Sequence, residues 1–199
     1  MTDEFRSICV FCGSSAGNHP KYLALAKSTG KAISQDGFRF VYGGGSFGLM
    51  GASARAAFEN GGKVLGIIPE FLVRSEGAFT EAEHRIVPNM HVRKMEMYQE
   101  SDAFIILPGG IGTIEEAVEV LSWMRLQLHQ KPVIFLSEDE YWEPLLGLIR
   151  HTIDIGFTPA WIKDDLLTTT SPSDAIEIIK KEWSAPKDKR SIWVDYDDI

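Results

Sequence analysis

Residues 103–116 read Ala-Phe-Ile-Ile-Leu-Pro-Gly-Gly-Ile-Gly-Thr-Ile-Glu-Glu, and this stretch combines the two kinds of element that decide the fold. Residues 103–107 form a continuous apolar run, which is typical of a strand buried on both faces. A proline and several glycines follow, and a helical pattern begins at about residue 112. We expect Glu115 and Glu116 in the first turn of that helix. The stretch therefore predicts a buried strand that ends in a glycine turn and opens a helix.

The same alternation continues in both directions along the chain. Short apolar runs separated by longer helical patterns indicate a parallel sheet with helices on both faces, the doubly wound α/β class. We expect one domain over residues 1–184 and a polar C-terminal tail over residues 185–199. The runs expected as strands are 8–12, 38–42, 64–68, 103–107 and 132–136, with a weaker candidate at 85–87. Helices are expected near residues 20–35, 47–60, 90–100, 112–129, 141–155 and 173–183.

Three loops rich in glycine or small residues follow expected strands at residues 13–15, 43–48 and 108–113. In open parallel sheets, ligands bind at the carboxyl ends of strands, near the point where the strand order reverses. Three such loops at corresponding places predict a single crevice. Backbone N–H groups in a glycine turn at a helix N-terminus attract anions, phosphate above all. Candidate substrate-binding residues in these loops are Gly13, Ser14, Gly44, Gly45, Gly109, Gly110, Ile111, Gly112 and Thr113.

The second loop admits a rival interpretation. Gly43-x-Gly45-x-x-Gly48 matches the dinucleotide fingerprint, and Glu70 follows at the end of the next strand, as in NAD- or FAD-binding proteins. That fingerprint normally occupies the first βα turn, however, and it leaves residues 108–116 unexplained. The glycines could also serve only to make a tight turn. A P-loop is excluded, because no Gly-Lys-Ser/Thr follows either glycine loop.

Two pairs of charged residues carry a structural and a functional interpretation each. At about 3.6 residues per turn, Arg93 and Lys94 share a helix face with two methionines, either as long stems over apolar surface or aimed at an anion in the crevice. Glu115 and Glu116 could simply favour the positive end of a helix. On a helical wheel the apolar stripe is Ile114, Ala117, Val118, Leu121 and Leu128, with Glu116 nearly opposite beside Val120 and Trp123. A helix apolar on two sides predicts a helix-mediated homodimer.

Composition excludes several other classes. The 199 residues carry a net charge of −8, which disfavours a nucleic-acid polymer as partner but allows one small anionic ligand. Cys9 and Cys12 lie three apart on an expected strand, so they point to opposite faces and we expect buried thiols and no shared metal. The histidines show no metal-ligand spacing, and no nucleophile elbow occurs. With an acidic start and no apolar run long enough to span a bilayer, we expect no membrane partner and a cytoplasmic protein.

Three motifs together resemble the LONELY GUY (LOG) family, from about Ile8 to about Trp183. They are Gly43-Gly44-Gly45-Ser46-x-Gly48-Leu49-Met50-Gly51, then Arg93-Lys94, then Pro108-Gly109-Gly110-x-Gly112-Thr113-x-x-Glu116. The resemblance implies a Rossmann-like catalytic domain, a homodimer and a phosphoribohydrolase. Such enzymes cleave the N-glycosidic bond of a cytokinin riboside 5′-monophosphate, and many relatives also accept AMP, without a cofactor or metal. The alternative on the same fold is a non-catalytic nucleotide- or molybdenum-cofactor-binding module.

The resemblance also implies roles for individual residues. Arg93 and Glu116 occupy the positions of the family's catalytic pair. Gly110 through Glu115 line the phosphate and ribose, while Lys94 and Glu76 match binding positions. The family was long labelled lysine decarboxylase, but this sequence offers no pyridoxal-phosphate lysine context. Cleavage of a ribosyl C–N bond builds positive charge on the sugar, which suits Glu116, whereas Arg93 is always protonated and is a positioning group.

Overall fold

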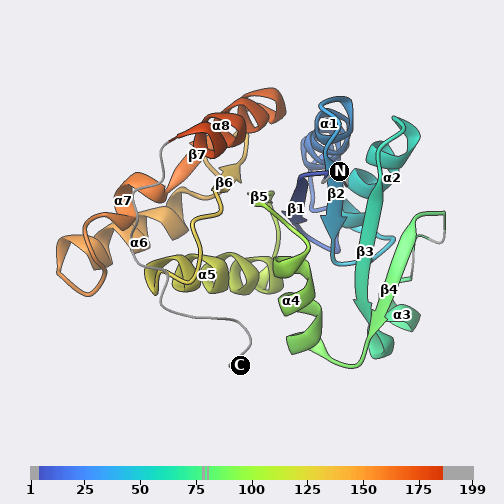
Figure 1. Ribbon diagram of the computed structural model, residues 1–199, viewed down its shortest axis with the longest axis horizontal. Helices are drawn as coiled ribbons and strands as arrows, with labels where there is room; N and C mark the ends of the chain where they lie inside the picture. Colours follow the sequence, from blue (N-terminus) through green and yellow to red (C-terminus); the bar gives the residue numbers. More distant parts are fainter. Residues whose placement is uncertain (1–4, 78, 80, 186–199) are drawn as a thin grey trace.

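A computed structural model of the chain describes residues 5–77, 79 and 81–185, with the side chain of Glu76 left out. Within this part, one sheet has the strand order β4-β3-β2-β1-β5-β6-β7, and every neighbouring pair is parallel (Figure 1). The strand order reverses at β1, which lies between β2 and β5. The strands are β1 (Ser7–Phe11), β2 (Arg39–Tyr42), β3 (Val64–Pro69), β4 (Glu83–Val87), β5 (Ala103–Ile106), β6 (Val133–Leu136) and β7 (Leu167–Thr169).

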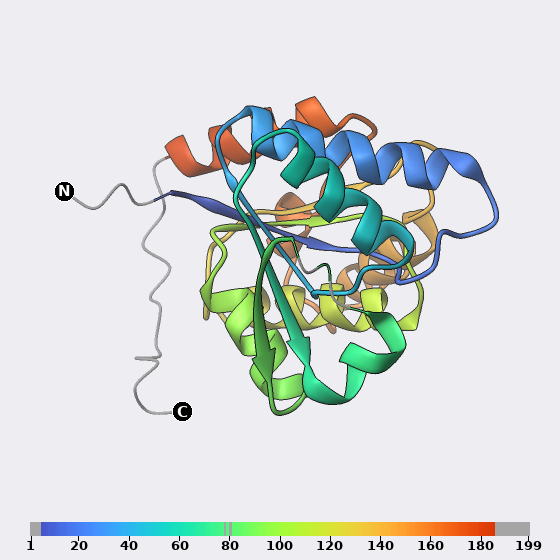
Figure 2. The same cartoon turned by 90° about the vertical axis from the view of Figure 1, so that its right-hand side faces the viewer.

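Helices cover both faces of the sheet, which confirms the doubly wound class. Figure 2 shows α1, α2 and α8 on one side and α4 and α5 on the other, and the buried side chains divide into two clusters in the same way. The helices are α1 (Pro20–Gln35), α2 (Gly48–Glu59), α3 (Glu70–Glu76), α4 (Met90–Gln99), α5 (Ile111–Arg125), α6 (Glu143–Asp154), α7 (Ile162–Asp165) and α8 (Pro172–Ser184). None of these described helices has both the length and the apolar character that crossing a bilayer requires.

The alternation of side chains along β1 explains the two cysteines. Cys9 packs in the cluster under α4 and α5, whereas Cys12 packs in the cluster under α1 and α2, so they lie on opposite faces as predicted. Both thiols are free and fully buried. Burial raises the pKa of each thiol well above its ordinary value, and the negative charge of Glu116 raises it further. Neither cysteine is therefore a reactive nucleophile in the folded chain.

The expected elements agree with the structure to within a few residues, and the weak candidate at residues 85–87 is the edge strand β4. Three short elements were not predicted, namely α3, α7 and β7. Each is between three and seven residues long, which is too short to show a clear hydrophobic period. The polar tail predicted for residues 185–199 lies outside the described residues except for Ala185.

The predicted buried face of α5 was wrong, because the helix is rotated about its axis relative to the expected apolar stripe. Its buried positions are Thr113, Glu116, Ala117, Val120, Leu121 and Met124, whereas Val118 is 43% exposed. The helix packs against α4 as well as the sheet, since Trp123 meets the Tyr98 ring edge-on with 5.0 Å between centroids. The buried arc is therefore turned toward α4. Val120 lies in a core cluster of its own chain, and Trp123 packs against that cluster. They therefore do not form the second apolar side that was predicted to face a partner subunit.

Candidate active site

The three glycine loops meet at the carboxyl end of the sheet, at the point where the strand order reverses. The Gly13 amide donates to the Pro108 carbonyl at 3.2 Å, which joins the loops that follow β1 and β5. The Leu49 amide, in the first turn of α2, donates to the Gly13 carbonyl at 3.0 Å and brings in the third loop. Parallel sheets bind ligands at this position, because the loops that follow the two strands at the reversal lead to opposite faces of the sheet and leave a crevice between them.

A cavity of about 400 Å³ lies between the loops that follow β1 and β5, and Gly44 and Gly45 of the second loop do not line it. Of the sequence-predicted residues, Gly13, Ser14, Gly109 and Gly110 line it. The rest of the wall comes from residues 15–18, Tyr22, Leu49, Pro108 and Tyr141. Tyr141 was missed in the sequence, because its hydroxyl reaches the glycine turn from a loop about 30 residues away and no local pattern marks it.

The N-terminus of α5 opens at this cavity. The helix begins at Ile111 after the N-cap Gly110, and no side chain caps it. Its first backbone N–H groups therefore have no capping partner from a side chain and suit an anion. The prediction that Glu115 and Glu116 lie in the first turn was wrong, since the first turn holds no acidic residue. The helix dipole consequently gives only a weak account of the two glutamates.

Arg93 and Glu116 form a nearly buried ion pair. Nη1 of Arg93 lies 3.5 Å from Oε1 of Glu116, and the two residues are 6% and 8% exposed. The guanidinium also donates from Nη2 to the Gly43 carbonyl at 3.1 Å and from Nε to the Ile67 carbonyl at 3.2 Å. These bonds offset part of the cost of burying a charge. The Arg93 side chain is therefore turned inward beneath the second glycine loop, and its role toward an anion in the crevice stays a prediction.

This pair does not line the 400 Å³ cavity. Glu116 lies about one helical turn after Thr113. The Thr113 hydroxyl packs against Gly109, since a β-carbon added to Gly109 would lie 2.1 Å from that hydroxyl oxygen. The cavity and the ion pair therefore adjoin the two ends of one short stretch, residues 109–116. Ile111 and Gly112 are exposed at the start of α5 between them.

Lys94 is paired with two carboxylates of α5. Its ammonium lies 2.5 Å from Oε1 of Glu115 and 2.9 Å from Oε1 of Glu119. Burial alone lowers the pKa of Lys94, but the two hydrogen bonds outweigh it and the pKa is raised. The Lys94 ammonium is thus already paired, and its expected role toward an anion in the crevice stays a prediction. A nucleotide would have to compete with Glu115 for this cation.

The second loop owes its shape to glycine. Gly44 adopts a left-handed φ of 79°, and a β-carbon there would lie 2.7 Å from the Ile68 side chain. His84, which the sequence analysis did not single out, places Nε2 3.1 Å from the Gly44 carbonyl. Gly45 is buried in the same loop. Glu76 ends α3, and its side chain lies outside what the structure describes.

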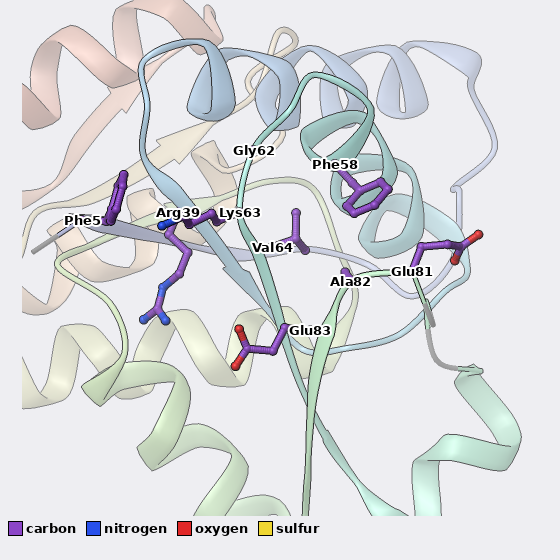
Figure 3. Close-up of a pocket in the computed structure, with 9 residues that line it drawn as sticks. All are labelled: Phe5, Arg39, Phe58, Gly62, Lys63, Val64, Glu81, Ala82 and Glu83. Atoms are coloured by element: carbon purple, nitrogen blue, oxygen red, sulfur yellow. The ribbon is translucent and has the colours of Figure 1, made fainter. Parts of the chain in front are cut away.

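A wider hollow of about 540 Å³ lies at the other end of the sheet (Figure 3). Arg39, Lys63 and Glu83, which stand at or next to the starts of β2, β3 and β4, contribute to its wall. None of the sequence-predicted site residues lines it. Arg39 is already paired with Glu100. Figure 3 shows Glu81 on the far side of the hollow from Arg39, so the charged side chains of the hollow do not gather at one point.

Comparison with known proteins assigns the family. The model of the family described as "Possible lysine decarboxylase" matches residues 50–179, which include the buried ion pair and the glycine turn before α5. The chain belongs to the LOG family. It is 42% identical over 182 residues to the cytokinin riboside 5′-monophosphate phosphoribohydrolase LOG1 of Arabidopsis thaliana, covering 91% of this chain and 84% of that protein.

A bacterial LOG relative is closer in sequence over a shorter stretch. The chain is 48% identical over 162 residues to the cytokinin riboside 5′-monophosphate phosphoribohydrolase of Rhodococcoides fascians, covering 78% of this chain and 80% of that protein. Among solved structures, the molybdenum cofactor binding protein of Rippkaea orientalis is similar with a TM-score of 0.70 and 22% identity, over 92% of this chain and all of that one. At that identity the likeness concerns the LOG fold alone.

Proposed function

We propose that this chain is a phosphoribohydrolase that cleaves the N-glycosidic bond of a nucleoside 5′-monophosphate to free base and ribose 5-phosphate. Cytokinin riboside 5′-monophosphate is the proposed substrate, with AMP as a second one. The observation that carries the proposal is the buried Arg93–Glu116 pair, in which Glu116 lies in the second turn after an uncapped helix N-terminus at the switch point of the sheet. The names of the relatives at 42% and 48% identity support the same reaction.

The phosphate belongs at the start of α5. Gly109 and Gly110 face the cavity, and the amides of the first turn carry no side-chain cap. A phosphate there would accept hydrogen bonds from the backbone without a cationic side chain. Gly13 and Ser14 close the cavity from the other side. The ribose then extends along residues 109–116 toward Glu116.

Glu116 is the proposed catalytic carboxylate. As the bond between C1′ of the ribose and the base nitrogen breaks, its electron pair leaves with the base and positive charge builds on the sugar. An ionised Glu116 stabilises that charge and takes a proton from the attacking water, and this proton passes to the departing base so that Glu116 is ionised again. Arg93 supplies the countercharge for a buried carboxylate and fixes its position through Gly43 and Ile67. Within the described residues, no cluster of side chains suits a metal ion, and this mechanism uses none.

We also propose that the enzyme acts as a homodimer paired through α5. Ile111, Val118 and Leu126 are 83%, 43% and 51% exposed. Their spacings of seven and eight residues correspond to about two turns each, so they form one stripe along α5 that ends at its C-cap, Leu126. In a two-fold dimer centred near Val118, Ile111 of one copy meets Leu126 of the other. The proposed compartment is the cytoplasm, because two buried, unpaired thiols suit a reducing environment.

A substrate panel tests the proposed function. Purified protein is incubated with AMP, isopentenyladenosine monophosphate and the corresponding nucleosides without phosphate, and free base and ribose 5-phosphate are measured separately. We expect both products in equal amounts from the monophosphates and little from the nucleosides. Nucleotide binding without turnover would instead indicate a non-catalytic binding module, and a nicotinamide-dependent reaction would indicate a dinucleotide enzyme.

A further inference from the structure

Two side chains tie the loop between β6 and α6 to the end of β5 and to the glycine turn that follows it, residues 108–110 (the phosphate turn). The Trp142 indole donates to the Ile106 carbonyl at 3.2 Å, and the Tyr141 hydroxyl donates to the Gly109 carbonyl at 2.6 Å. Trp142 is 3% exposed and packs edge-on against Phe135, with 5.5 Å between the ring centroids. Trp142 therefore anchors the loop in the core, and Tyr141 extends from it to the rim of the cavity.

The backbone just before these residues adopts an uncommon conformation. Glu140 has a φ of 56°, in the left-handed region that side chains other than glycine rarely adopt. Such strain persists only where the surrounding structure imposes it, and it gathers at functional sites. Here it turns the chain so that Tyr141 reaches Gly109. Tyr141 also meets Trp142 edge-on at 5.0 Å between centroids, which limits the freedom of its ring.

The Tyr141 hydroxyl holds the peptide between Gly109 and Gly110. This peptide has no β-carbon on either side. Gly109 packs against the Thr113 hydroxyl, whereas the space beside Gly110 is open. Such a peptide flips more readily than others. In a planar trans peptide, the carbonyl of Gly109 and the amide of Gly110 point in opposite directions. Whatever fixes the carbonyl therefore fixes the direction of the amide.

We propose that Tyr141 is a positioning residue for the 5′-phosphate. Its hydroxyl holds the Gly109 carbonyl and so keeps the Gly110 amide available as a donor at the start of α5. Without this bond, a flip of the peptide would turn a carbonyl dipole toward the anion in place of that amide. The inference rests on the proposed function for the identity of the ligand, and it assigns Tyr141 to the phosphate end of the substrate.

Two substitutions separate the hydroxyl from the ring. Tyr141→Phe removes the hydrogen bond and keeps the wall of the cavity, whereas Tyr141→Leu removes both. Binding of ribose 5-phosphate and of inorganic phosphate is measured by calorimetry, with adenosine as the ligand that lacks a phosphate. Losing one hydrogen bond in the cradle should weaken ribose 5-phosphate binding by about tenfold in Tyr141→Phe and leave adenosine binding unchanged. With AMP as substrate, we expect KM to rise while kcat stays close to that of the wild type.

The outcomes separate this inference from the proposed function. Wild-type affinity for ribose 5-phosphate in Tyr141→Phe overturns the inference, even if the wild type hydrolyses AMP. Loss of binding only in Tyr141→Leu also overturns it, because the ring would then act merely as a wall. Weaker phosphate binding in Tyr141→Phe supports it even if the wild type releases no base, since binding is read without turnover. If the wild type binds neither phosphate ligand, Tyr141 has no phosphate to position and the inference fails. Thermal unfolding without ligand checks that each variant is folded.

Discussion

Nη2 of Arg93 donates to the Gly43 carbonyl at 3.1 Å, and a β-carbon added to Gly43 would lie 1.7 Å from that same nitrogen. The absence of a side chain at Gly43 is thus what allows the guanidinium to lie beneath the second glycine loop. Because Arg93 also carries the ion pair with Glu116, the shape of this loop determines where the carboxylate is held.

Gly43→Ala should therefore displace Arg93 and leave the fold intact, since the clash is with the end of a flexible side chain. We expect base release from AMP to fall by about 100-fold, the size of effect that a misplaced catalytic group produces. Gly147→Ala is the matched control, because Gly147 lies in α6 with no atom near the added carbon. Wild-type turnover in Gly43→Ala would contradict the role given to Arg93.

Glu100 links pH to stability. Burial alone raises the pKa of Glu100, but hydrogen bonds from Arg39 and Arg85 outweigh it and hold the pKa below its usual value. A depressed pKa stabilises the fold above the unfolded value and loses that effect as the pH falls through the folded one. Because Glu100 is partly exposed, Glu100→Gln should lower the free energy of unfolding by about 1–2 kcal/mol at neutral pH.

Urea denaturation at several pH values checks this expectation. The difference in free energy of unfolding between the wild type and Glu100→Gln should shrink as the pH falls from the pKa of Glu100 in the unfolded chain through its lower pKa in the folded chain. Glu177→Gln is the control, since Glu177 meets Lys180 on the surface and its side chain is 70% exposed. A constant difference down to acid pH would show that Glu100 acts by packing and not by charge.

Val118→Arg tests the proposed pairing through α5. A charge at the centre of the stripe of Ile111, Val118 and Leu126 should dissociate the dimer, because an unpaired cation would be buried between the helices. Leu148→Arg is the control on α6, where Leu148 is 60% exposed, against 43% for Val118. Sedimentation should give a dimer for wild type and Leu148→Arg and a monomer for Val118→Arg. A dimeric Val118→Arg would place the interface elsewhere.

The pattern of apolar runs and the positions of the glycine-rich loops predicted the parallel sheet and the loop that precedes α5, because both signals are local in the sequence. They did not predict the rotation of α5, since the contact between Trp123 and Tyr98 depends on how α4 packs. The same limit hid Tyr141, whose partner Gly109 lies 32 residues earlier in the chain. The edge strand β7 was not predicted, because three partly exposed residues are too few to show a hydrophobic period.

The measurement that tests the central claim most directly is base release by the wild type and by Glu116→Gln, each incubated with AMP and with isopentenyladenosine monophosphate. Glu116→Gln keeps the size of the side chain and removes its charge. We expect the wild type to release free base and the variant to do so at least about 100-fold more slowly, as the loss of a general base predicts. No base from the wild type, or an undiminished rate in Glu116→Gln, would contradict the account.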